Sequence, residues 1–166
     1  DWSSDVCSSD LTLTAPGRFL IDIGVSGSRY RKTLTFVSAS LVTSVRDQPV
    51  TGSVTGSVNL TPKLALYGGH VRGFEELAVE PANAVNRGAV PPAIRTNQTD
   101  LGLRYALTPA LSLVAGVFPI TKPYYNLDEQ ANYRELGTSS NRGVEMSLTG
   151  ALRPGLTVVL GNVLLD

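Results

Sequence analysis

The stretch Val50–Leu60, VTGSVTGSVNL, decides the fold class because its residues alternate in character without exception. Valine, glycine and leucine take the even positions, and threonine, serine and asparagine take the odd positions. A repeat of two residues places one class on each face of a β-strand, whereas a helix needs a repeat of about 3.6. The stretch is therefore predicted to form a strand with one apolar and one polar face.

The same alternation recurs in two later stretches, TNQTDLGLRYAL (96–107) and SSNRGVEMSLTG (139–150). The stretches LSLVAGVF and LTVVLGNVLL are apolar at nearly every position and are less diagnostic. Turn residues between these runs complete an expected set of seven strands, at residues 18–28, 49–60, 64–74, 96–107, 111–121, 139–151 and 156–165.

The connections between the expected strands choose the architecture. Three are short and contain proline: Thr61–Lys63, Thr108–Ala110 and Arg153–Gly155. The connections between them are long, at roughly 28–48, 75–95 and 121–139. Loops of about twenty residues are uncommon in compact soluble domains, and regular alternation of short turns with long loops is typical of outer-membrane barrels. No apolar run reaches the roughly 18 residues of a membrane helix. The predicted fold is all-β, an antiparallel meander of about seven long strands forming an open section of a transmembrane β-barrel.

The expected section is incomplete as a barrel. Single-chain bacterial barrels have even strand numbers from eight upward, because an unpaired edge in lipid leaves backbone groups without partners. The sequence also stops on the apolar run LTVVLGNVLLD. We therefore expect a fragment of a longer protein, missing residues at both ends.

The first eleven residues, DWSSDVCSSDL, differ in composition from the rest and hold the only tryptophan, the only cysteine and three of the fourteen acids. They lack the basic and apolar segments of a secretory signal. They resemble a translated sequencing adapter, so we expect residues 1–11 to be a disordered artefact and residues 12–166 to be the barrel domain. The remainder carries fourteen basic and eleven acidic residues, a formal charge of +3. Its scattered basic residues predict no nucleic-acid partner.

Three stretches together resemble the barrel of TonB-dependent outer-membrane receptors of the siderophore-receptor type: 60–76, 86–125 and 137–166. In this family, Tyr67 and Arg72–Gly73 would lie on a strand leading into a long outer loop. Pro91–Pro92 and Gln98 would precede the next strand. The run Arg142–Gly143–Val144–Glu145 matches the family's RGxE strand start. The ordered set spans about residues 49–166, with weaker support from 18 to 48.

This resemblance implies a large barrel in the outer membrane of a Gram-negative bacterium, plugged by an N-terminal domain that this chain lacks. Its partners would be outer-membrane lipid, the TonB complex acting through the plug, and a ferric siderophore or a similar scarce ligand. The section would supply barrel wall and extracellular loops, and would not transport a ligand alone. It does not identify the ligand.

Loop and rim residues are the candidates for ligand binding: Arg72, Arg87, Arg95, Tyr124 and Tyr125. Guanidinium groups offer planar, permanently charged donors to an anionic ferric chelate. Ordinary loop solvation remains an alternative for the arginines, and a membrane-interface girdle remains one for the tyrosines. Within the wall, alternation predicts four lumen-facing residues, Gln98, Asp100, Arg104 and Glu145, which we expect to be paired or wet because unpaired burial is costly.

No catalytic, metal or cofactor site is predicted. His70 is the only histidine and has no ligand partners at metal-binding spacing. Glu75, Glu76 and Glu80 have no nearby base or nucleophile and read as a solvated loop. The protein is thus expected not to be an enzyme. Two alternatives to the receptor remain: a section of a TonB-independent channel or adhesin barrel, and a soluble all-β binding domain.

Overall fold

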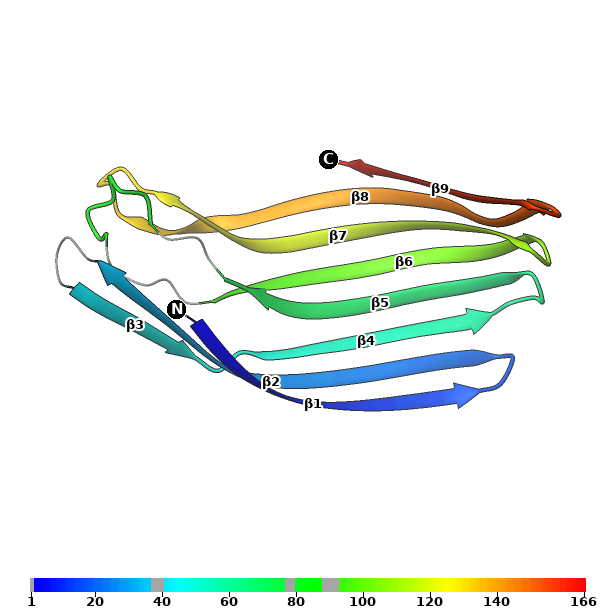
Figure 1. Ribbon diagram of the computed structural model, residues 1–166, viewed down its shortest axis with the longest axis horizontal. Helices are drawn as coiled ribbons and strands as arrows, with labels where there is room; N and C mark the ends of the chain where they lie inside the picture. Colours follow the sequence, from blue (N-terminus) through cyan, green and yellow to red (C-terminus); the bar gives the residue numbers. More distant parts are fainter. Residues whose placement is uncertain (1, 37–40, 77–79, 88–92) are drawn as a thin grey trace.

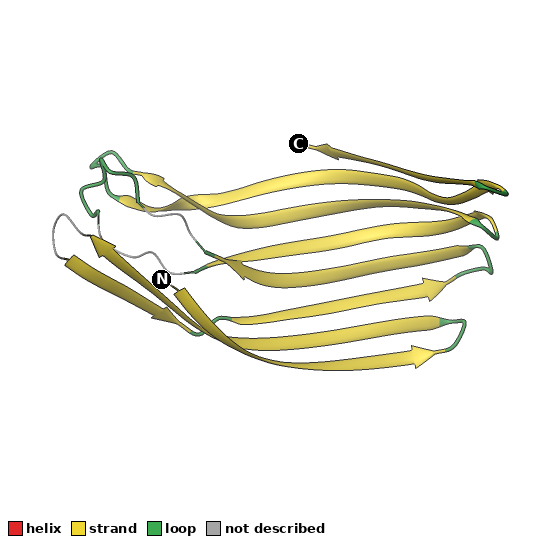
Figure 2. Ribbon diagram, viewed as in Figure 1, coloured by secondary structure: helices red, strands yellow, loops and turns green. Residues whose placement is uncertain are grey.

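The computed structural model describes residues 2–36, 41–76, 80–87 and 93–166, and within them it forms nine β-strands and no helix. Figures 1 and 2 show one extended sheet running the length of the molecule. The strands are β1 (Trp2–Ala15), β2 (Phe19–Phe36), β3 (Leu41–Asp47), β4 (Val50–Asn59), β5 (Leu64–Glu75), β6 (Ile94–Thr108), β7 (Leu111–Leu127), β8 (Tyr133–Arg153) and β9 (Leu156–Leu165). In these ranges no helix is long and apolar enough to cross a membrane.

The strands form an antiparallel meander in the order β1-β2-β4-β5-β6-β7-β8-β9, with β3 paired to the far part of β2. The sheet is open, with β1 and β9 at its two edges. In Figure 1 the β2–β3 hairpin splays away from β4, because β2 pairs with β4 over Phe19–Gly27 and with β3 only from Tyr30 onward. The predicted open antiparallel meander is confirmed.

Tight turns join the strands at one end of the sheet, on the right in Figure 1. Gly17 and Gly155 follow prolines and adopt φ of +73° and +78°. Proline followed by glycine at positive φ is the signature of a type II turn, and the Arg18 amide closes the first turn by donating to the Ala15 carbonyl at 2.9 Å. The Thr61 hydroxyl accepts from the Leu64 amide at 3.0 Å and holds another of these turns.

The structure corrects three of the expected boundaries. Residues 2–11, expected to be disordered, form most of β1 and pair in register with β2 from Trp2↔Lys32 to Leu11↔Ile23. The long connection expected at 28–48 contains the rest of β2 and all of β3. The hairpin of β7 and β8 extends to Leu127 and Tyr133, well past the expected ends at 121 and 139. Ladder hydrogen bonds continue beyond the alternating stretch because they use backbone groups alone.

The two faces of the sheet differ in chemistry. We call the face that carries Tyr67, Asp100 and Glu145 the polar face, and the face that carries Leu66, Leu101 and Val144 the apolar face; each set lies at facing or alternating positions of the ladders. The apolar face is open, with Leu101 63% and Val144 52% exposed. β9 departs from the pattern, since Val159 and Val163 lie opposite Thr149 and Glu145.

Most of the buried side chains that the structure describes lie toward the end with the long connections. The buried side chains of the described residues belong to β2, to the start of β4 and β6, and to the connection before β6: Ser28, Tyr30, Lys32, Pro49, Glu80, Ala84, Ala93 and Ile94. The Tyr30 ring packs edge-on against Phe74 at 6.4 Å between centroids. The rest of the described sheet encloses no core. Its stability therefore depends on the hydrogen bonds between strands and on contacts of its two faces with their surroundings.

Candidate functional site

A tyrosine crosses the polar face from β5 to β8. The Tyr67 hydroxyl donates a hydrogen bond to Glu145 Oε1 at 3.2 Å, although β6 and β7 lie between the two residues. The ring reaches this far because the facing positions on those strands are Gly102 and Gly116. A Cβ atom at Gly102 would lie 2.5 Å from the ring, and one at Gly116 would lie 2.7 Å from the hydroxyl. We call Gly102 and Gly116 the glycine lane, because the Tyr67 ring lies over these two residues.

The four residues predicted to face a lumen gather around this bridge. Asp100, Arg104 and Glu145 all interact electrostatically with the Tyr67 hydroxyl. Gln98 donates from Nε2 to Asp100 Oδ1 at 2.8 Å. All four therefore share the polar face, and their charges have both signs. The Tyr67 bridge was missed at the sequence level, although a tyrosine and two glycines in one register row are the signal that identifies it.

Near β1 the polar face continues with a hydroxyl–carboxylate contact. Thr12 donates from Oγ1 to Asp22 Oδ1 at 2.6 Å, and the Asp10 carboxylate lies beside Gly24 and Ser53. A shallow hollow of about 330 Å³ follows this row and is lined in part by Ser8, Asp10, Ser26, Thr51 and Ser53. Small hydroxyl side chains here leave the face hydrophilic and sterically open.

The long connections dock on one another. Asn86 donates from Nδ2 to the Tyr133 carbonyl at 2.9 Å and accepts from the Tyr133 amide at 2.8 Å, in the manner of a neighbouring strand. The Val85 amide donates to the Ala131 carbonyl at 2.8 Å. Figure 1 shows the connection between β5 and β6 lying beside the β7–β8 hairpin. Two ion pairs join the same region, Lys32–Glu76 at 2.8 Å and Lys122–Glu75 at 3.0 Å.

Asp128 organises the tip of the β7–β8 hairpin. Its Oδ1 accepts from the amides of Asn132 at 2.8 Å and Gln130 at 3.0 Å, and Arg134 Nε donates to its Oδ2 at 2.6 Å. The Asn132 hydrogen bond, with smaller effects from Arg134 and Gln130, lowers the pKa of the Asp128 carboxyl below its ordinary value. The carboxylate is only 9% exposed. The charged form therefore holds the loop closed.

The five residues predicted to bind a ligand do not converge. Arg87 is exposed in the connection between β5 and β6. Arg72 and Arg95 lie on the apolar face, in alternation with Leu66 and Leu101. Tyr124 is 47% exposed and accepts a hydrogen bond from Asn126 Nδ2 at 2.6 Å, whereas Tyr125 packs against Tyr133 at 6.0 Å between centroids.

Several motif residues have other surroundings. His70 is bonded through Nδ1 to Thr99 Oγ1 at 2.9 Å on the apolar face, and within the described ranges no three acidic, histidine or cysteine side chains are grouped to hold a metal ion. Pro91–Pro92 lie outside the described residues. Glu80, expected in a solvated loop, is buried, with no hydrogen-bond partner for Oε2 among the residues described.

Known structures share this architecture. BauA, the ferric preacinetobactin receptor from Acinetobacter baumannii, superposes with a TM-score of 0.76 at 23% identity. The ferric-catecholate import receptor Fiu from E. coli K12 gives 0.75 at 14%, and the ferric yersiniabactin uptake receptor FyuA from Yersinia pestis gives 0.73 at 20%. Each match covers 99% of this chain. No protein-family model and no curated protein matches the sequence.

The coverage of the known structures is partial. The chain spans 25% of BauA, 27% of Fiu and 26% of FyuA. At these identities the likeness concerns the fold, the open antiparallel meander described above. The chain therefore has the fold of one section, about a quarter of the receptor's length, of the β-barrel of TonB-dependent siderophore receptors.

Proposed function

We propose that residues 12–166 are part of the barrel of a TonB-dependent receptor in the outer membrane of a Gram-negative bacterium. The complete receptor takes up a ferric siderophore or a similar scarce ligand, and this section contributes wall and extracellular loops. Its work is gated transport and not bond chemistry. Residues 1–11, which resemble adapter sequence, are foreign to the receptor in this proposal.

The division between the two faces is the observation that carries the proposal. On the apolar face, Leu101, Val144 and Leu164 are more than half exposed, across three different strands. Soluble monomers rarely expose contiguous apolar patches beyond a few hundred Å², whereas a barrel wall turns such a face to lipid and its polar face to a wet lumen. The Tyr67–Glu145 bridge and the Gln98–Asp100 pair then line the lumen.

The placement of the loops refines the proposed ligand contacts. Arg87 and Tyr124 remain the candidates, since both are exposed at the end where the long connections dock. Arg72 and Arg95 lie on the apolar face, opposite the four residues predicted to face the lumen. The Tyr125 ring packs against the Tyr133 ring. Arg87 would supply charge to an anionic chelate, and Tyr124 would supply an aromatic surface.

Transport in cells tests the proposal. The complete reading frame that contains residues 12–166 would be expressed in a Gram-negative strain that lacks its own ferric-siderophore receptors, and uptake of radioactive iron from a panel of siderophores would be measured. We expect uptake from at least one siderophore, and loss of that uptake in the same strain without TonB. Uptake that persists without TonB would indicate a passive channel instead. Absence of uptake across hydroxamate, catecholate and mixed-ligand siderophores would refute the proposed substrate class.

A further inference from the structure

Two arginines of neighbouring strands lie close together on the apolar face. Arg72 of β5 faces Asn97 of β6, and Arg95 of β6 faces Phe74 of β5, so the arginines are diagonal neighbours on adjacent strands. Diagonal positions of an antiparallel pair are about 7–8 Å apart, within reach of long side chains. Both residues are exposed, and neither forms an ion pair with a residue that the structure describes. Two guanidinium groups so placed can share one anion.

The pair stands where the apolar face changes character. On β6 the positions that alternate with Arg95 are Asn97 and Thr99, and beyond them come Leu101 and Leu103. On β5 the positions that alternate with Arg72 toward the tight-turn end are His70, Gly68 and Leu66. Arg142 of β8 lies at a similar level, but Asp166 is paired beside it. Arg29 and Arg31 of β2 are also exposed on this face, farther toward the long connections, whereas Arg72 and Arg95 stand next to its apolar part.

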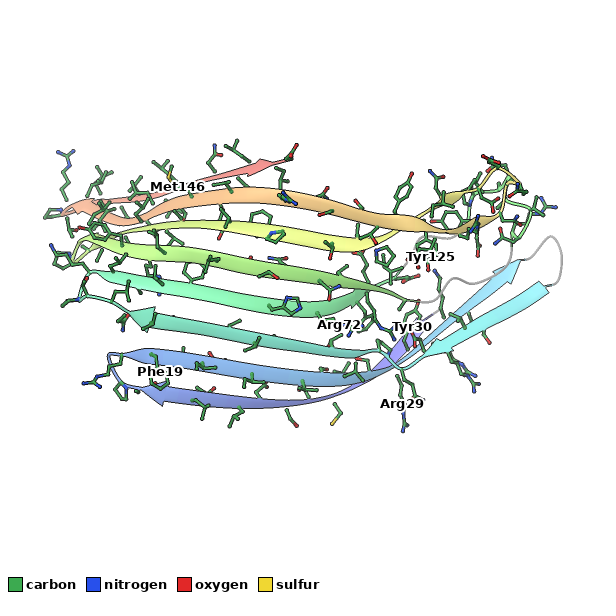
Figure 3. All side chains as sticks on the ribbon, turned by 180° about the vertical axis from the view of Figure 1, so that it is seen from behind. Phe19, Arg29, Tyr30, Arg72, Tyr125 and Met146 are labelled. Atoms are coloured by element: carbon green, nitrogen blue, oxygen red, sulfur yellow. The ribbon has the colours of Figure 1, made fainter. Side chains whose placement is uncertain are left out.

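Directly beyond the boundary the apolar face contains a groove of about 340 Å³. Phe19, Ile21, Val58, Leu66 and Leu101 line it. Gly56 and Gly68 form its floor, where the lack of side chains leaves the hollow open, and a Cβ at Gly56 would make only ordinary contacts at 3.6 Å and 3.8 Å. Gly68 is four residues from Arg72 along β5, which is about 13 Å of strand. Figure 3 shows Phe19 toward the tight-turn end and Arg72 toward the other end.

We propose that Arg72 and Arg95 bind the phosphate of a membrane lipid whose acyl chain lies in the groove over Gly56 and Gly68. The inference rests on the proposed placement of the apolar face in lipid. Guanidinium groups pair with phosphate oxygens in bidentate geometry, and basic side chains near a membrane surface favour anionic headgroups. A soluble anion would use the arginines but not the groove, so the two features together select an amphipathic ligand.

Lipid binding to the refolded chain tests this site. The chain would be refolded in maltoside detergent, its strand content verified by circular dichroism, and its lipid affinities measured by native mass spectrometry. The probes are dioleoyl phosphatidic acid and dioleoylglycerol, which differ only in the phosphate, with inorganic phosphate as a competitor. We expect the Arg72→Gln/Arg95→Gln variant to bind phosphatidic acid about ten-fold or more weakly than the parent chain, with dioleoylglycerol unaffected.

Control variants separate this site from general electrostatics. Arg18→Gln/Arg153→Gln removes the same charge from the tight-turn end of the sheet and is expected to leave phosphatidic acid affinity unchanged. Arg72→Lys/Arg95→Lys should retain most of that affinity, and Gly56→Leu should weaken both lipids by filling the groove. Equal losses in the two glutamine variants, or equal affinity of the parent chain for both lipids, would overturn the proposal. Displacement of lipid by inorganic phosphate would show a soluble-anion site instead. None of these outcomes depends on iron transport.

Discussion

The glycine lane beneath Tyr67 predicts that the effect of one mutation, Gly116→Ala, depends on whether residue 67 carries a hydroxyl. In the parent chain, Gly116→Ala places a Cβ atom 2.7 Å from the Tyr67 hydroxyl, so the hydroxyl must move away from Glu145. Loss of that hydrogen bond costs about 1 kcal/mol. Alanine in a strand is also more stable than glycine by roughly 0.5–1 kcal/mol, because it loses less backbone entropy on folding. The two effects nearly cancel, and little net change in the free energy of unfolding is expected.

Removal of the hydroxyl uncouples these effects. Tyr67→Phe alone should destabilise the chain by about 1 kcal/mol, since Glu145 loses its donor. In the Tyr67→Phe background the new methyl group meets no hydroxyl, and Gly116→Ala should then stabilise by roughly 0.5–1 kcal/mol. A double-mutant cycle should therefore show a coupling energy of about 1 kcal/mol.

Urea unfolding of the detergent-refolded chain, followed by far-ultraviolet circular dichroism, measures all four corners of the cycle. Gly161 offers a matched control, because a Cβ there would meet nothing within 4 Å. Gly161→Ala should have the same effect in both backgrounds. Additive effects at Gly116, within about 0.3 kcal/mol, would refute the placement of the Tyr67 ring over the lane.

Three further predictions concern the loops and turns. Asn86→Ala removes both partners of the Tyr133 backbone, and we expect the Tyr133 amide to exchange with solvent at least about ten-fold faster by hydrogen-exchange mass spectrometry. The pKa of Asp128 is lowered in the folded loop, so its stabilising contribution is complete above the ordinary pKa and is lost as pH falls through the folded pKa. Protection of the hairpin-tip amides, measured relative to their intrinsic exchange rates at each pH, should therefore fall in strong acid, and Asp128→Asn should remove that fall. Gly155→Ala should destabilise the chain by about 1 kcal/mol in urea unfolding, since φ at this position is +78°.

Each of these predictions has its own control. Asn83→Ala changes an exposed amide of the same connection and should leave exchange at Tyr133 unchanged. A pH profile that is identical in the parent chain and in Asp128→Asn would show that the carboxylate does not hold the loop. Gly161→Ala has no positive φ to oppose it, so an equal loss of stability at positions 155 and 161 would contradict the turn argument.

Six of the expected strands end within one residue of the observed strand at the tight-turn end: those at 18–28, 49–60, 64–74, 96–107, 111–121 and 156–165. The extensions at the other end were not expected, because the polar residues there pair through backbone groups and carry no apolar period. Arg72 was expected on a strand leading into the long connection and Arg95 at the end of that connection. Their face was nevertheless open to prediction, since both alternate in step with leucines of their own strands.

The sequence by itself determined the strands and their two chemically distinct faces, since side-chain direction in a strand depends only on local backbone geometry and repeats every two residues. Only the tertiary structure decided which residues meet. The Tyr67–Glu145 contact spans 78 positions in sequence and requires β5, β6, β7 and β8 to pair in one specific register. Ladder hydrogen bonds are chemically alike at every position, so register is selected by turn lengths and cross-strand packing acting over the whole sheet.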